Sequence, residues 1–176
     1  DKIVQRAVVM ILEAIFEQDF HAFSHGFRKG HSPHQALHEV REQCRTLHIN
    51  WIVDADVSGF FDNLDWSHLR EFIQQRVSAG GILRLIGKWL HAGVLEAGAL
   101  MHPDKGTPQG GVVSPMLANV FLHHVLDEWC VKDVHPRMQG HCFLTRFADD
   151  FIIGCEREAD ARRIMVVLPK RFIRFR

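Results

Sequence analysis

Two adjacent carboxylates are the feature of the sequence with the clearest chemical potential. Asp149 and Asp150 are flanked by Phe147 and by the apolar run 151–153. Neighbouring carboxylates in an apolar setting repel each other, and a divalent cation is their natural counter-charge. A third acid, Asp56, ends another short apolar run. If the two runs are neighbouring strands of one sheet, Asp56 and Asp149 can share a pair of metal ions.

Three such carboxylates suggest metal-assisted phosphoryl transfer. Two Mg²⁺ ions about 4 Å apart can clamp both the attacking and the leaving oxygens of an in-line displacement. Hard oxygen ligands suit Mg²⁺, or Mn²⁺ as the alternative, better than Zn²⁺. Taken alone, the Asp-Asp pair is more simply explained as an exposed turn, because Asp is common in turns. The phosphoryl-transfer interpretation therefore depends on the other motifs of the chain.

A β-hairpin and a further strand are the elements that must position these acids. The apolar segments 142–146 and 151–155 read as strands joined by a turn at 148–150, and residues 51–57 read as a third strand. Helices are expected at 2–16, 33–47, 65–77, 82–90, 114–126 and 157–168, and a strand or hairpin arm at 94–101. This order predicts an α+β fold in which helices back an antiparallel sheet.

Composition places the chain among ordinary globular proteins. Of its 176 residues, 47% are hydrophobic and 24% charged. The formal net charge of +0 argues mildly against nucleic-acid binding, although residues 162–176 gather six basic side chains without an acid. Four cysteines without CxxC spacing indicate reduced thiols of a cytoplasmic protein. No apolar run approaches the roughly 20 residues of a membrane span, so no membrane partner is expected.

Two further kinds of site are not supported by the spacing. The 13 histidines include no HExxH pattern and no Cys/His quartet, so the sequence predicts no zinc site. The Gly-rich segment 106–111 lacks the Lys-Ser/Thr ending of a P-loop. Both chain ends interrupt a helical or apolar pattern, which suggests a piece of a longer protein.

Four segments in order resemble the reverse transcriptases encoded by group II introns and their relatives. They are Ser24 to Ser32, Asp56 to Asn63, Gly106 to Asn119 and Arg146 to Asp150. Nearly the whole chain is covered, and the Gly-Thr-Pro-Gln-Gly-Gly…Ser-Pro…Ala-Asn string is the most specific part. The resemblance implies a right-hand polymerase with a fingers portion at 1–50 and the palm at 51–176. The thumb and the N-terminal fingers strands are absent from the chain.

The resemblance also implies the roles of individual residues. Asp56, Asp149 and Asp150 match the catalytic ligands of two Mg²⁺ ions, and the Val57 carbonyl adds a backbone ligand. The residues implied in binding the incoming nucleotide are Ser58, Gly59, Phe60, Phe61, Gln109 and Gly110. Among them, Phe61 matches the position under the sugar, where a ring disfavours a 2′-hydroxyl. The residues implied in supporting the template are Gly26, Phe27 and Arg28.

The implied activity is that of an RNA-directed DNA polymerase. Its partners are an RNA template, a DNA or RNA primer and deoxynucleoside triphosphates, with intron RNA as a further partner of the parent protein. Two alternatives stay open: a non-catalytic, maturase-like RNA-binding fragment and a palm-type nucleotide cyclase. The chain departs from the family pattern at Phe147, where Tyr is usual, at Ser58 in place of Lys, and at Lys29 in place of Pro. An intron, retron-like or CRISPR-associated parent is equally compatible.

Overall fold

A computed structural model of the protein describes residues 2–57, 65–91, 94–96, 99–101 and 111–175. The chain divides into two compact units, each described here by itself. The first comprises residues 1–19, 58–121 and 175–176, and the second comprises residues 20–57 and 122–174. This division concerns compactness alone, so the functional boundary expected after residue 50 stays a prediction.

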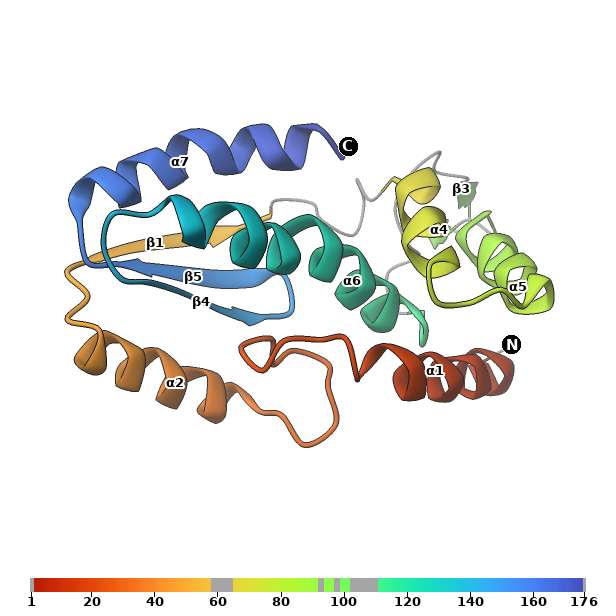
Figure 1. Ribbon diagram of the computed structural model, residues 1–176. Helices are drawn as coiled ribbons and strands as arrows, with labels where there is room; N and C mark the ends of the chain where they lie inside the picture. The colour runs from red at the N-terminus through yellow and green to blue at the C-terminus, as the bar shows by residue number, and fades with distance from the viewer. Residues whose placement is uncertain (1, 58–64, 92–93, 97–98, 102–110, 176) are drawn as a thin grey trace. The chain divides into compact units, whose positions relative to one another are not determined.

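The second unit is built on a three-stranded antiparallel sheet (Figure 1). Its strands are β1 (Trp51–Asp56), β4 (Cys142–Phe147) and β5 (Asp150–Cys155), in the order β1-β5-β4. Val53, Leu144 and Ile153 from the three strands are buried, which explains why these segments are apolar. The predicted hairpin is confirmed. Its second strand pairs with β1, which meets the condition under which the acids of the two strands can lie together.

Helices cover both faces of this sheet, α2 (Pro33–Thr46) on one and α7 (Glu158–Ile173) on the other (Figure 1). Ser32 caps α2 as predicted, since its side chain accepts a hydrogen bond from the Gln35 N–H. The expected α+β arrangement is therefore present.

The end of α7 differs from the sequence-based expectation. The sequence predicts that the helix ends near Leu168, but it continues to Ile173, although Pro169 lacks the N–H donor that a helix interior uses. Tertiary contacts hold its last turn: Arg171 Nε donates to the Val125 carbonyl at 2.9 Å, and the Phe172 ring stacks on Phe151 with centroids 6.2 Å apart. These contacts offset the loss of one helical hydrogen bond.

The predicted helix at 114–126 is longer and less regular than expected. Its first part is α6 (Ser114–Leu122), which is followed by π-helical segments at His123–Asp127 and Cys130–Val134 and a 3₁₀ turn at His135–Arg137. In the first π segment the Glu128 N–H donates to the His123 carbonyl, five residues back. This winding brings side chains five positions apart onto one side, and π segments are frequent at functional sites.

The first unit contains α1 (Lys2–Phe16), α4 (Trp66–Gln74), α5 (Gly80–His91) and the hairpin of β2 (Val94–Glu96) and β3 (Ala99–Met101). Asp65 caps α4 by accepting from the Ser67 and His68 N–H groups. Each of these elements was expected at its place. Among the described helices, none has the length and apolar character needed to cross a membrane.

Candidate active site

The three predicted metal-binding acids lie together at one end of the sheet in the second unit. Asp56 on β1 and Asp150 on β5 are direct antiparallel partners, so their side chains share one face. The Cβ atoms of such partners lie about 4.5–5.5 Å apart. Asp149 is in the two-residue turn that precedes β5. Strand pairing thus brings residues 56 and 150 side by side although 94 positions separate them.

Like charges dominate the electrostatics of this group. Partial burial raises the pKa of Asp150, and the neighbouring carboxylates of Asp149, Asp56 and Asp54 raise it further. A raised pKa means that the surroundings of Asp150 disfavour the ionised form of its carboxyl group. A divalent cation would relieve the repulsion, and carboxylate oxygens are the ligands that Mg²⁺ prefers. The donor chemistry of Asp56, Asp149 and Asp150 therefore fits the metal that the sequence implies.

The turn that carries Asp149 has an unusual backbone. Ala148, the first of its two residues, has φ +58°, a left-handed conformation that favours glycine. A non-glycine residue held there costs about 1–3 kcal/mol unless its surroundings impose the conformation. Arg146 supplies part of that support, because its Nη1 donates to the Ala148 carbonyl at 2.8 Å. The hairpin tip, residues 147–150, is thus held by a neighbouring side chain.

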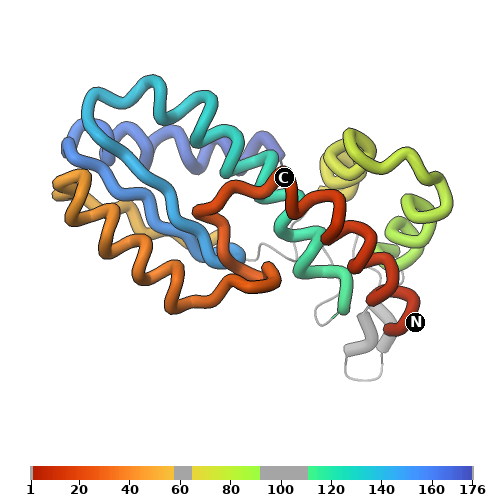
Figure 2. The backbone as a smooth tube through the Cα atoms, turned by 60° about the horizontal axis from the view of Figure 1, so that its bottom comes forward, coloured from red at the N-terminus to blue at the C-terminus, as the bar shows by residue number. Residues whose placement is uncertain are grey.

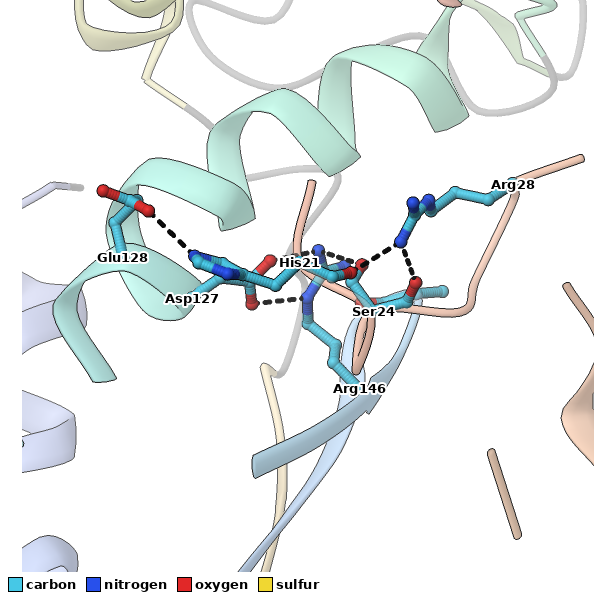
Figure 3. Close-up of polar contacts among 7 residues, drawn as sticks. His21, Ser24, Arg28, Asp127, Glu128 and Arg146 are labelled. Carbon is cyan, nitrogen blue, oxygen red and sulfur yellow. Dashed lines mark hydrogen bonds and ion pairs between the residues drawn. The ribbon is translucent and has the colours of Figure 1, made fainter. Parts of the chain in front are cut away.

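Arg146 forms a buried ion pair beneath the hairpin tip (Figure 3). Its Nε donates to Asp127 Oδ1 at 2.9 Å and its Nη2 donates to Asp127 Oδ2 at 2.7 Å. Nη2 also donates to the Ser24 hydroxyl at 2.7 Å. Arg146 and Asp127 are both 0% exposed. The fork-like pairing suits a guanidinium and a carboxylate, and it joins three segments of the unit.

The loop at residues 20–31 runs beside the outer edge of β4 (Figure 2). The His25 N–H donates to the Arg146 carbonyl at 2.8 Å, and the Arg146 N–H donates to the Phe23 carbonyl at 2.9 Å. The loop then passes so close to the hairpin tip that a Cβ on Gly26 would lie 2.0 Å from the Ala148 nitrogen. Only glycine fits there without a backbone shift.

Phe27 and Arg28, the other two predicted template residues, have different environments. Phe27 is 54% exposed and has φ +57°, so it projects from the loop. Arg28 turns its guanidinium toward its own loop, where Nη1 donates to the carbonyls of His21 and Ser24 (Figure 3). The Arg28 guanidinium also lies 5.5 Å from the centre of the Phe20 ring. Arg28 therefore stabilises the loop, and its contact with a template phosphate stays a prediction.

A groove of about 320 Å³ lies between α2 and the acidic face of the sheet. Apolar side chains form most of its wall, and the carboxylates of Asp54 and Asp150 belong to it. The residues lining it are Pro33, Ala36, Leu37, Val40, Asp54, Thr145, Phe147, Asp150, Phe151 and Ile152. The groove reaches the acidic end of the sheet from the side of the second helix.

All six predicted nucleotide-binding residues fall outside the described part of the chain. They are Ser58, Gly59, Phe60, Phe61, Gln109 and Gly110. Val57, the predicted backbone ligand, follows β1 directly and is half-buried. The nucleotide and backbone-ligand roles therefore stay predictions.

The Arg146–Asp127–Ser24 network is the part of the site that sequence reasoning missed. A signal for it exists, because Arg146 is the one charged residue in a strand that otherwise reads Cys-Phe-Leu-Thr and Phe. A buried charge is almost always paired, so an arginine in an apolar strand predicts a buried acid nearby. Which acid it pairs with depends on tertiary structure.

Comparisons with known proteins agree on one family. Residues 1–175 match the family described as reverse transcriptase (RNA-dependent DNA polymerase). Group II intron-encoded protein LtrA of Lactococcus lactis subsp. cremoris is 41% identical over 132 residues, which is 75% of this chain and 22% of that protein. Protein YkfC of Escherichia coli strain K12 is 37% identical over 126 residues, which is 70% of this chain and 33% of that protein. The chain thus spans a third or less of these relatives.

A solved structure supports the fold. Telomerase from Candida albicans, in a complex with a fragment of telomeric RNA, superimposes with a TM-score of 0.71 over 97% of this chain and 32% of that chain. Sequence identity is 13%, so this likeness concerns the fold alone.

Proposed function

The chain belongs to the reverse transcriptase (RNA-dependent DNA polymerase) family, and from that premise we propose that it carries the palm active site of an RNA-directed DNA polymerase. The predicted resemblance to reverse transcriptases of the group II intron type is confirmed by its relatives. One observation carries the catalytic proposal: Asp56 and Asp150 are paired across neighbouring strands, and Asp149 is in the adjoining turn.

In this proposal Asp56, Asp149 and Asp150 hold two Mg²⁺ ions. When bound, such ions lower the pKa of a primer 3′-hydroxyl and neutralise the leaving pyrophosphate. The contribution of the protein is to position the carboxylates that would hold these ions. Arg146 fixes the carbonyl of Ala148 and thereby the direction in which the turn presents Asp149. Prior fixation of charged groups is how such sites avoid reorganisation during the reaction.

The remaining roles come from the family resemblance. Ser58 to Phe61, Gln109 and Gly110 bind the incoming deoxynucleoside triphosphate, with Phe61 excluding a 2′-hydroxyl. Gly26 to Arg28 support an RNA template, and a DNA or RNA primer supplies the 3′-hydroxyl. The close approach of Gly26 to Ala148 supports this assignment, because it joins the template segment to the hairpin tip.

Primer extension with matched variants tests the proposal. We expect Asp149→Asn in the full-length protein to lower Mg²⁺-dependent extension of a primer on RNA by about 10³-fold, since a lost ligand removes roughly 4 kcal/mol of charge stabilisation. Asp54→Asn is the control, because Asp54 is an exposed acid on the same strand face that has no proposed ligand role. Extension by Asp149→Asn at the wild-type rate would contradict the proposal.

The same assay separates the alternatives. Salt-sensitive RNA binding without extension by the wild-type protein would favour the maturase-like RNA-binding role. A cyclic product formed from nucleoside triphosphates alone would favour the nucleotide cyclase. Whether the parent belongs to an intron, a retron-like system or a CRISPR-associated system follows from the coding sequence that flanks the chain.

A further inference from the structure

A second group of potential metal ligands lies in the same unit, made of side chains that the polymerase proposal does not use. It consists of His21 in the loop at 20–31, and His123 and Glu128 in and just after the first π-helical segment. Each residue offers one ligand atom, and these atoms all lie within 4.8 Å of one another. His21 Nε2 lies 2.8 Å from Glu128 Oε1 (Figure 3).

His123 has an unsatisfied polar atom. The residue is only 5% exposed, and among the described residues its Nδ1 has no hydrogen-bond partner. Buried polar atoms without a partner are rare in proteins, and each calls for an explanation such as an ion. The rings around it are those of His124, His21 and Phe20, with centroids 5.1, 5.5 and 5.6 Å from that of His123. The phenyl ring offers no hydrogen bond, so a ligand from outside the chain would satisfy this nitrogen.

Local helix winding brings His123 and Glu128 together. In a regular α-helix, residues five positions apart point about 140° away from each other. Here the Glu128 N–H bonds to the His123 carbonyl, so the two residues lie one above the other. The π-helical winding is thus what converts an i, i+5 pair into a pair of converging side chains.

We propose that His21, His123 and Glu128 form a binding site for a transition-metal ion, with Zn²⁺ as the best match. Two imidazole nitrogens and one carboxylate oxygen are a common zinc set, whose fourth position is filled by water. Tetrahedral zinc at about 2 Å from each ligand places the ligand atoms about 3.3 Å apart, so atoms now up to 4.8 Å apart would move closer together on binding. Lys132 pairs with the Oε2 of Glu128, which leaves Oε1 directed at His21.

The protonation state of His123 favours this role. Burial lowers the pKa of His123 to about 4, so its ring is neutral at pH 7 and one nitrogen has a free lone pair. A metal ion requires that neutral form. Neutral imidazole also prefers Zn²⁺ to Mg²⁺, so this site and the carboxylates of the hairpin tip would take different ions.

Another histidine pair in the same loop lacks the converging geometry of the proposed site. His25 Nε2 lies 2.6 Å from Glu39 Oε2, and His25 Nδ1 lies 3.1 Å from His31 Nδ1. Both nitrogens of His25 therefore have partners, and these partners lie on opposite sides of the ring. The three residues do not converge on one point, in contrast to His21, His123 and Glu128.

A metal at this site would fasten the loop at 20–31 to the helical segment that begins at His123. The same loop carries Gly26, which touches the hairpin tip, and Ser24, which bonds to Arg146. The proposed ion would therefore fix the loop from which the predicted template residues project. This inference does not depend on the polymerase proposal.

Titration of the metal-free protein with Zn²⁺ and Co²⁺, in excess Mg²⁺, tests the site. We expect the wild-type protein to bind one equivalent of Zn²⁺, to show the intense visible absorption of tetrahedral Co²⁺, and to gain thermal stability with Zn²⁺. His123→Gln should bind Zn²⁺ at least tenfold more weakly and lose the Co²⁺ signal. His38→Gln, at an exposed histidine of α2 outside the cluster, is the control and should behave as wild type.

Three results would overturn the proposal. They are wild-type protein without a tetrahedral Co²⁺ spectrum, equal Zn²⁺ affinity of His123→Gln and wild type, and an equal loss of affinity in His123→Gln and His38→Gln. If His123→Gln does not fold, His21→Gln replaces it, because His21 is half-buried and lies in a loop. The Co²⁺ spectrum of the wild type decides the question independently of any variant.

Discussion

Asp127 and Asp150 belong to the same unit but differ in what balances their negative charges. Asp127 is fully buried, and both of its oxygens accept hydrogen bonds from Arg146. Asp150 is exposed and faces other acids, which together with partial burial raise its pKa. One carboxylate therefore has an internal counter-charge, and the other has acidic neighbours. The difference shows that the fold itself balances the charge of Asp127, whereas a cation from outside would add stability around Asp150.

The two regions are also physically connected. Arg146 neutralises Asp127 and, with its remaining donor group Nη1, holds the carbonyl of Ala148 in the hairpin tip. The charge-balanced Arg146–Asp127 pair thus supports the hairpin tip, where the negative charges are not balanced. The variants below test this relation, from the largest expected effect to the smallest.

Replacing Arg146 should have the largest effect on stability. We expect Arg146→Met to lower the free energy of unfolding by about 3–5 kcal/mol, because it leaves Asp127 charged and unpaired in the interior. The double variant Arg146→Met/Asp127→Leu removes both charges and should recover most of that loss. Urea unfolding followed by circular dichroism measures both. A double variant as unstable as the single one would show that the cost does not come from the unpaired acid.

Gly26→Ala tests the contact between the loop and the hairpin tip. The new Cβ would meet the Ala148 backbone, so either the loop or the tip must shift, at a cost of about 1–3 kcal/mol. Gly87→Ala in α5 is the matched control. A Cβ there meets nothing within 4 Å, and alanine favours a helix by about 1 kcal/mol over glycine. Thermal unfolding should give opposite signs for the two variants, and equal signs would contradict the close approach.

Ser24→Ala tests how much the loop at 20–31 contributes to stability through its hydrogen bond to Arg146. Losing a hydrogen bond to a guanidinium should cost about 1.5 kcal/mol in unfolding free energy. Thr145→Val is the control, since the buried Thr145 hydroxyl has no partner within the part of the chain that the structure describes, and its loss should be neutral or slightly stabilising. Unfolding in urea compares the two. A larger loss in Thr145→Val than in Ser24→Ala would count against the network.

Asp150→Asn should have the smallest effect, with the opposite sign. Because the folded pKa of Asp150 lies above the ordinary value of 3.8, the folded state binds more protons than the unfolded state between these two pKa values. Stability contributed by this group therefore falls as pH rises through that window and stays low above it. We expect Asp150→Asn to raise the melting temperature at pH 7 without Mg²⁺.

Mg²⁺ provides the complementary measurement. It should raise the melting temperature of the wild-type protein at pH 7 and have a smaller effect on Asp150→Asn. Asp133→Asn is the control, because Asp133 forms an exposed ion pair with Arg137 and lies outside the acidic group. Equal responses to Mg²⁺ in all three proteins would show that the acids at the hairpin tip do not bind the ion.

Most of the fold could be predicted from the sequence because local patterns determine it. The strand around Val53, the hairpin at residues 142–155 and the Ser32 cap of α2 all follow from short-range spacing. The extension of α7 past Pro169 could not be predicted, since contacts of Arg171 and Phe172 with distant residues outweigh the local effect of proline. The π-helical winding at His123 likewise has no periodic signal.

The site was predictable to a different degree. Asp56, Asp149 and Asp150 could be named because their motifs are specific, and strand pairing places Asp56 beside Asp150. The partner of Arg146 could not be named, because many acids of the sequence are equally suitable before the chain folds. The role expected for Arg28 illustrates the same limit: its bonds to nearby carbonyls depend on the shape of the loop.

The contact between Ser24 and Arg146 has a consequence for biosynthesis. These residues are 122 positions apart, so the loop at 20–31 leaves the ribosome long before its partner strand exists. At about 5–20 residues per second, the delay is roughly 6–24 seconds. During that interval Gly26 has no hairpin tip to pack against. Contacts at such long sequence separation also form slowly. The end of the sheet that carries Asp56 and Asp150 is therefore expected to be among the last parts of the nascent protein to become ordered.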